Sequence, residues 1–137
     1  MQRVLPVLGV VLAALTLAAC GGSDRARSAT FVGHWFGHTR GIDVYRSGHG
    51  TEYINSGAPP VATLTFDVLR VTGTASTADA RIRVTSVRIF DKSAFPRSPP
   101  HVGELGTLAL RHGVVTDSVT HVFYCAPKPA EKGTCGV

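Results

Sequence analysis

The stretch with the most distinctive chemistry is Phe31–Arg40, which contains Trp35, the only tryptophan of the chain, and also His34 and His38. Histidine is the commonest metal ligand in proteins. If the stretch is an extended strand, Trp35 lies on one face and both histidines lie on the other, because side chains alternate. The two imidazoles would then be about 13 Å apart, at about 3.3 Å per residue. They could not bind the same ion.

A metal site would therefore need another histidine beside this strand. The remaining histidines are His49, His101, His112 and His121. None belongs to a His-x-His or Asp/His cluster with ligand spacing. His121 could in principle reach into a barrel as an axial haem ligand. The sequence assigns no metal site and no cofactor, and a barrel that binds a small ligand, metal or haem is the alternative function. The candidate ligand-binding residues are Trp35, His34, His38 and His121.

No catalytic motif accompanies these residues. The chain lacks a Gly-x-Ser-x-Gly elbow, a Ser-x-x-Lys motif and a His-Glu-x-x-His motif. Carboxylates occur singly, among them Asp43, Asp67, Asp79, Asp91, Glu104 and Asp117. None can be paired from the sequence for acid–base catalysis. We therefore expect a non-catalytic protein and assign no catalytic residue, while an enzyme of unrecognised type stays an alternative.

Arginines form the remaining chemical pattern. Arg81, Arg83 and Arg88 should point outward from one strand, with Arg70 beside them on the neighbouring strand. One interpretation is an ordinary solvated face that also protects a sheet edge. The other is contact with an anionic surface, either lipid headgroups or a polyanionic glycan, which salt would weaken.

These residues must be positioned by β-strands, because no segment shows helical periodicity. Runs of β-branched and aromatic residues alternate instead with Gly, Pro, Asn and Asp. The predicted strands are 34–40, 42–45, 51–55, 61–72, 80–91, 105–111, 114–117 and 120–125. About eight consecutive strands predict an all-β domain, a small antiparallel up-and-down barrel or half-barrel. A two-sheet β-sandwich is the alternative, and pairing of the first strand with the last would indicate closure.

The two long predicted strands each change the phase of their apolar alternation. The change falls at Val68-Leu69 in the first and at Thr85-Ser86 in the second. A one-residue change turns every later side chain to the opposite face unless a bulge or bend compensates. We therefore predict a bend or bulge at Val68-Leu69, facing Thr85-Ser86.

The N-terminus has the pattern of a secretory leader. Arg3 precedes an apolar run, 4–17, that is shorter than the roughly 20 residues of a transmembrane helix. The run ends at Leu17-Ala18-Ala19-Cys20, which resembles the lipobox of bacterial lipoproteins. The resemblance implies cleavage after a signal peptide, 1–19, and lipidation of the Cys20 sulfur at the head of a flexible tether, 20–30. A plain signal peptide followed by an incidental cysteine is the alternative.

The remaining cysteines are Cys125 and Cys135. If Cys20 is lipidated, they form the only available pair, in a compartment where thiols oxidise. We expect them to form a disulfide in the C-terminal tail of a single β-domain, 31–137. The short loop predicts a stabilisation of about 2–3 kcal/mol by loop-closure entropy. A two-cysteine metal site is the rival interpretation, but its spacing is unusual.

Charge narrows the range of partners. Removal of 1–19 takes away Arg3 and lowers the formal net charge from +5 to +4. This mild basicity suits an anionic lipid surface or a polyanionic envelope polymer, and we expect no nucleic-acid partner. The expected location is the extracytoplasmic face of the cell membrane, with the protein held by lipid on Cys20. An envelope polymer or another protein is the expected partner, and the sequence does not determine the oligomeric state.

Three further resemblances concern the start of the domain and the whole chain. Gly33-x-Trp35 resembles the start of lipocalin-type barrels, in which the tryptophan plugs the closed end. Gly33-x-Trp35-x-Gly37 also resembles the start of nitrobindin-type haem barrels, whose pattern continues with Gly where this chain has Thr39. The whole arrangement resembles small actinobacterial lipoproteins of unknown function, which implies no activity. The expectation is a lipid-anchored, non-catalytic binding or interaction module of the cell envelope.

Overall fold

The computed structural model describes residues 29–54, 60–95, 98–128, 132–133 and 135. The predicted signal peptide, Cys20 and all but the last two residues of the tether lie outside this part of the chain. The assigned elements are eight strands and one short 3-10 helix, η1 (Lys92–Ala94). Among the described residues, no helix has the length and apolar character needed to cross a membrane.

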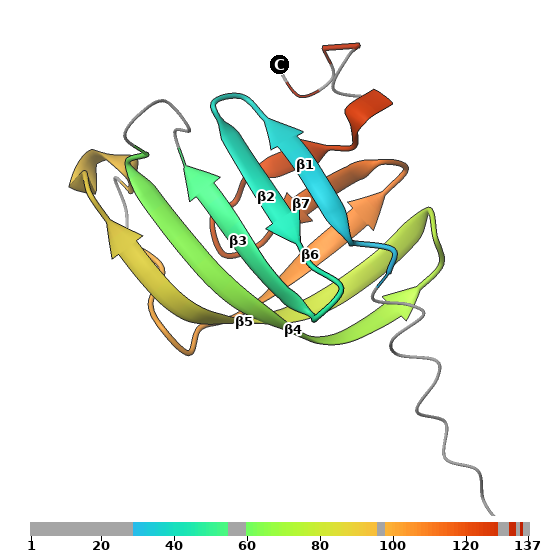
Figure 1. Ribbon diagram of the computed structural model, residues 1–137, viewed down its shortest axis with the longest axis horizontal. Coiled ribbons are helices and arrows are strands. Elements are labelled where there is room, and N and C mark those ends of the chain that lie inside the picture. Colours follow the sequence, from blue (N-terminus) through green and yellow to red (C-terminus); the bar gives the residue numbers. More distant parts are fainter. Residues whose placement is uncertain (1–28, 55–59, 96–97, 129–131, 134, 136–137) are drawn as a thin grey trace, which may run out of the picture.

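The strands form a closed antiparallel barrel in which each strand pairs with the next and β8 pairs with β1 (Figure 1). They are β1 (Gly33–Gly37), β2 (Arg40–Val44), β3 (His49–Ile54), β4 (Ala62–Gly73), β5 (Thr77–Ile89), β6 (Leu105–Arg111), β7 (Val114–Asp117) and β8 (Phe123–Cys125). Phe36 of β1 lies opposite Cys125 of β8 and closes the barrel. The predicted up-and-down barrel is confirmed, and the sandwich alternative is wrong.

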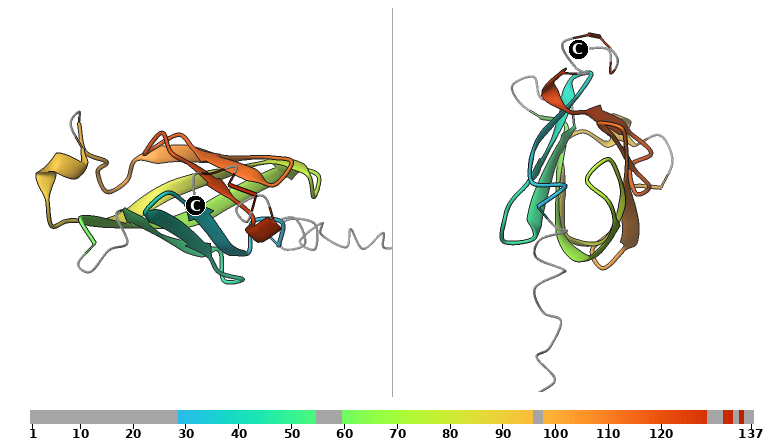
Figure 2. Two further views of the ribbon diagram at one scale, coloured as in Figure 1. Left: turned by 90° about the horizontal axis from the view of Figure 1, so that it is seen from above. Right: turned by 90° about the vertical axis from the view of Figure 1, so that its right-hand side faces the viewer.

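The long β4–β5 hairpin joins two walls of the barrel. β1, β2 and β3 form one wall, and β6 and β7 lie in the other (Figure 2). Inward side chains of every strand except β3 form the main apolar core, and Ile54, Ala62 and Leu64 form a second cluster. Phe31 and Trp35 belong to this core at the end where the chain enters, and the Trp35 Nε1 donates to the Phe31 carbonyl at 2.8 Å. That bond satisfies the polar atom of a buried indole.

Two bulges correct the apolar phase of the long hairpin. Leu69 is an extra residue in β4, and Thr85 is an extra residue in β5, so the predicted irregularities exist. The prediction that they face each other is wrong. Leu69 lies beside the Arg81-Ile82 step of β5, whereas Thr85 lies beside the Thr65-Phe66 step of β4. Each strand is corrected where its own pattern changes phase, and the register of the hairpin staggers the two sites.

The predicted strand limits differ from the observed ones by up to three residues; β3, for example, begins at His49 rather than Thr51, and β5 at Thr77 rather than Ala80. Two of the wrong limits lie next to a residue with left-handed backbone. The first strand was predicted to continue to Arg40, but β1 ends at Gly37, and Thr39 in the following turn has a φ of 53°. The last strand was predicted to begin at Thr120, but β8 begins at Phe123, after His121 with a φ of 59°. Extended strands need negative φ, so neither strand can run through its left-handed residue.

The predicted disulfide is confirmed. Cys125 and Cys135 are bonded, with their Cα atoms 5.8 Å apart. Both residues are buried, and Phe36 and Val114 pack against them. The bond therefore attaches the C-terminal tail to β8, the strand that closes the barrel.

One close contact inside the barrel makes a stability prediction. Gly50 lies opposite Phe66, and a Cβ at this position would be 2.1 Å from the ring atom Cζ. Gly50→Ala must displace the ring within a packed core, so the free energy of unfolding should fall by about 1–3 kcal/mol. Denaturant titration measures the change. Thr116→Ala, on the exposed face of β7, is the control and should stay within about 0.5 kcal/mol of the parent. Unchanged stability of Gly50→Ala would contradict this packing.

Candidate functional site at the barrel mouth

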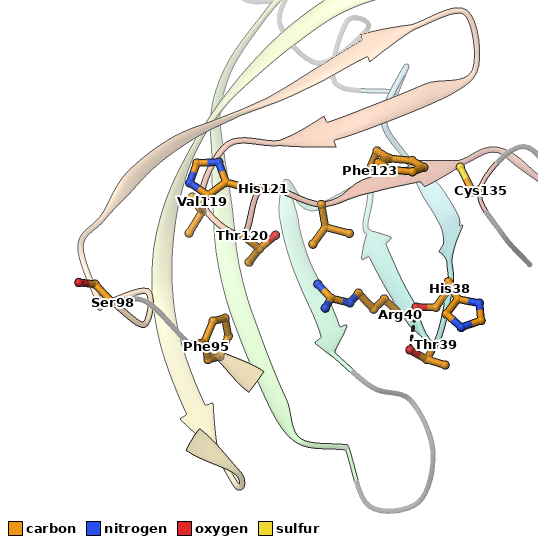
Figure 3. A pocket seen from close by; sticks show the side chains of 11 residues that line it. His38, Thr39, Arg40, Phe95, Ser98, Val119, Thr120, His121, Phe123 and Cys135 are labelled. Atoms are coloured by element: carbon orange, nitrogen blue, oxygen red, sulfur yellow. Dashed lines mark hydrogen bonds between the residues drawn. The ribbon is translucent and has the colours of Figure 1, made fainter. Parts of the chain in front are cut away.

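A pocket of about 580 Å³ opens at one end of the barrel. Its walls come from the turn between β1 and β2, the segment after η1 and the loop between β7 and β8 (Figure 3). Its main apolar lining residues are Phe95, Val119, Val122 and Phe123. Its main polar lining residues are His38, Arg40, Thr120 and His121. The volume and the mixed lining are those of a small-molecule site, which combines apolar walls with a few polar groups.

Arg40 is the charged group at the centre of this pocket. Its side chain extends from the start of β2 into the space between Phe95 and the loop that contains Thr120 (Figure 3). Arg40 is half-buried, and none of the ion pairs among the described residues includes it. A guanidinium group can hold a carboxylate or phosphate with two parallel hydrogen bonds. The pocket therefore presents a cation that an acidic ligand can neutralise.

A buried polar cluster lies behind Thr120. The Thr120 Oγ1 is 2.8 Å from the Glu52 Oε1 and 3.2 Å from the Asp117 Oδ2. The Tyr124 hydroxyl also donates to the Glu52 Oε1, and the Val119 amide donates to Asp117 at 2.8 Å. We call Glu52 and Asp117 the carboxyl pair. Two pocket-lining residues join the pair to the pocket: Thr120 contacts both carboxyl groups, and the Val119 amide donates to Asp117.

Burial keeps a proton on the carboxyl pair. Burial and, to a lesser extent, the nearby charge of Asp117 together raise the pKa of Glu52 to about 8. Burial also raises the pKa of Asp117 above its usual range, although hydrogen bonds from Val119 and Thr120 oppose this. Two ionised carboxylates in an apolar interior would repel each other at high cost. At neutral pH Glu52 is therefore a neutral acid.

The sequence contains a signal for this cluster that no catalytic motif includes. Gly50, Glu52 and Ile54 share one face of β3, and that face points into the barrel. Asp117 likewise follows the inward Val115 on β7. An acidic residue in phase with buried residues is a candidate for an interior site. That these two acids meet depends on barrel closure, which spacing along the chain does not reveal.

The structure separates the four residues predicted to bind a ligand. His38 and His121 line the pocket. Trp35 is buried in the core and does not line it. His34 is exposed on the outside of the barrel, where its Nδ1 lies 2.7 Å from the Asp43 Oδ1. Only the two histidines in turns and loops reach the mouth, because the strand residues of β1 point either into the core or out to solvent.

The four predicted arginines lie on the outer face of the β4–β5 hairpin. Arg70, Arg81, Arg83 and Arg88 are all exposed. Arg70 of β4 lies directly opposite Arg81 of β5. None of these four side chains takes part in an ion pair within the part of the chain that the structure describes. The hairpin therefore presents a basic outer surface, as its sequence predicts.

Neither the arrangement of possible metal ligands nor similarity to known proteins indicates a function. Over the described residues, no group of three or more His, Cys, Asp or Glu side chains is placed to hold a metal ion. Comparison with protein-family models, curated proteins and solved structures found no match. The chemistry of the site therefore rests on the geometry of the barrel mouth.

The carboxyl pair predicts how stability depends on pH. Folded Glu52 keeps its proton up to a pKa of about 8, whereas the ordinary value is 4.5. The folded state thus binds more protons than the unfolded state between these limits, and stability falls as pH rises from 4.5 to 8. Glu52→Gln keeps an oxygen acceptor for Tyr124 but cannot ionise, so this variant should show a much flatter profile.

Denaturant midpoints of both proteins across this pH range test the prediction. Wild type should lose roughly a few kcal/mol of stability, at about 1.4 kcal/mol per unit of pKa shift. Glu104→Gln, a partly exposed carboxyl change outside the buried cluster, is the matched control and should keep the wild-type slope. A wild-type profile as flat as that of Glu52→Gln would show that the cluster holds no such proton.

Proposed function

We propose that this protein is a lipid-anchored envelope protein that binds a small amphipathic acid in the mouth of its barrel. The observation that supports this proposal is the pocket of about 580 Å³, in which Arg40 extends among apolar side chains. Arg40 has no carboxylate partner among the described residues. A half-buried cation in an apolar pocket favours an anion that brings its own apolar surface.

The lining indicates how such a ligand would bind. Its apolar part would pack against Phe95, Val119 and Val122, and its acidic group would accept hydrogen bonds from Arg40. Each buried methylene would add about 0.8 kcal/mol to the affinity. His38 and His121 lie at the rim, where imidazole nitrogens can contact further polar groups of the ligand.

The burial of the carboxyl pair favours a binding protein over an enzyme. Glu52 is 1% exposed and Asp117 is 2% exposed. Acid–base catalysis requires a group within hydrogen-bond reach of the substrate. The layer formed by Thr120 and Val119 separates both carboxyl groups from the pocket. The pair therefore supports the floor of the site and does not contact its contents.

An anchor on Cys20 would place the mouth away from the membrane. The chain enters the barrel at Phe31, whereas the turn that follows β1 lies at the mouth (Figure 1). The proposed tether has a relaxed span of roughly 15–20 Å as a flexible chain. The pocket would then face the aqueous side of the envelope, where a small ligand can enter it.

The binding proposal is tested with a fluorescent amphipathic anion, anilinonaphthalene sulfonate, and the full chain. We expect saturable fluorescence enhancement whose affinity Arg40→Gln weakens about ten- to a hundredfold, because loss of a charge-assisted hydrogen bond costs about 1.5–3 kcal/mol. Arg46→Gln removes the same charge from the exposed β2–β3 turn, outside the pocket, and is the matched control. Equal affinities of the two variants, or no saturable binding by wild type, would exclude the site.

The anchor is tested separately in a bacterial host fed with labelled palmitate. Cys20→Ser should abolish the acyl label and release the protein from membranes, because no other sulfur occupies the lipobox. The double variant Cys125→Ser, Cys135→Ser is the control and should keep its label. Label that persists in Cys20→Ser would show that the lipid is attached elsewhere, and absence of label from wild type would show that the lipobox is not recognised.

A further inference from the structure

The bulge in β4 brings two arginines side by side. Between the inward residues Val68 and Val71, β4 has two outward residues, Leu69 and Arg70, and the second of these lies opposite Arg81. Without the extra residue, Arg70 would move into an inward register position. Bulges commonly re-aim a side chain in this way. The backbone irregularity therefore produces a pair of guanidinium groups on the outer face.

A hollow of about 410 Å³ surrounds this arginine pair on the outer face of β4, β5 and β6. Its lining also includes three residues with hydroxyl groups, Thr72, Thr107 and Ser118, together with Asp79, Leu105 and Gly106. The Ser118 Oγ already accepts the Thr107 amide at 2.8 Å, so its own proton is available to donate to another group. The hollow thus combines two cations with hydroxyl donors.

The side chains in and beside the hollow carry an excess of positive charge. Like charges that lie directly opposite each other destabilise an antiparallel pair. Asp79 is the only carboxylate that lines the hollow among the described residues, and its Oδ1 is held by Arg111 at 2.8 Å. Counting Arg111, three guanidinium groups face one carboxylate, which leaves a net charge of +2. A bound anion would relieve the repulsion.

We propose that Arg70 and Arg81 form a binding site for a phosphate group, separate from the mouth pocket. Two guanidinium groups can surround a tetrahedral oxyanion with paired, charge-assisted hydrogen bonds. The hydroxyl groups of Thr72, Thr107 and Ser118 supply neutral donors around it. The two lining sets share no residue, so this site does not depend on the proposed ligand of the mouth.

The phosphate group could come from two sources, free phosphate or the phosphodiester of a lipid headgroup. The hollow lies partly on the β4–β5 hairpin, and the turn of this hairpin lies near the point where the chain enters the barrel (Figure 1). A protein anchored through its N-terminus would turn this end toward the membrane. The location therefore favours the phosphodiester, and the test separates the two sources.

Calorimetric titration of the full chain in neutral detergent, at low salt, tests the site. The probes are inorganic phosphate and glycerophosphorylglycerol, a soluble phosphodiester. Wild type should bind at least one of them, and the double variant Arg70→Gln, Arg81→Gln should bind at least tenfold more weakly. Arg88→Gln, an exposed arginine on the same strand as Arg81 but outside the hollow, is the matched control and should change affinity less than twofold.

Each outcome decides the proposal. Tighter binding of the diester supports a headgroup site, and tighter binding of inorganic phosphate supports a site for free phosphate. No binding of either probe by wild type overturns the proposal. An equal loss in Arg88→Gln also overturns it, because the effect would then be that of diffuse charge. The double variant should be at least as stable as wild type without anion, since it removes a repulsion, and denaturant titration verifies its folding.

Discussion

The hydrogen bond from Tyr124 to Glu52 joins the last strand of the barrel to the third across the interior. Closure depends on it because β8 has three residues and one residue pair, Phe36 opposite Cys125, links it to β1. Tyr124 is fully buried, and Gly37 of β1 leaves room for its ring, since a Cβ there would lie 3.1 Å from the Cδ1. The short strand β8 is therefore held in the barrel by side-chain contacts as well as by backbone pairing.

The buried cluster around this bond shapes the mouth. Burial raises the pKa of Glu52 and keeps its carboxyl group neutral, although the hydrogen bond that it accepts from Tyr124 opposes the shift. Thr120 then bridges Glu52 and Asp117 and holds the loop between β7 and β8 over the interior. The pocket begins above that loop. The buried cluster thus sets the depth of the pocket, and Arg40 supplies its charge.

The barrel separates two basic sites with different surroundings. Arg40 lies among apolar side chains at one end, which suits an anion with an apolar body. Arg70 and Arg81 lie in a shallow hollow on the outer sheet, which suits a hydrated oxyanion. The proposed anchor would direct the first site away from the membrane and bring the second nearer to it. With that anchor, the barrel would bind a dissolved ligand at its mouth and a membrane surface on its outer sheet.

Local patterns were sufficient for much of this fold. Alternation of apolar residues predicted the strands, and the phase changes near Leu69 and Thr85 predicted both bulges, because each strand needs its own apolar face inside. The sequence also predicted the cysteine pairing and the outward direction of the arginines. The strand limits near Thr39 and His121 were not predicted, because neither residue type signals a left-handed backbone.

The sequence by itself therefore determined the all-β class, the strand order, the disulfide and the basic outer face. Each of these follows from side-chain alternation or from a small set of residues of one type. Only the tertiary structure decided that Glu52 meets Asp117, that Arg40 enters the pocket and that Trp35 does not. Those relations join residues far apart in the chain, and they depend on barrel register and closure, which no local pattern contains.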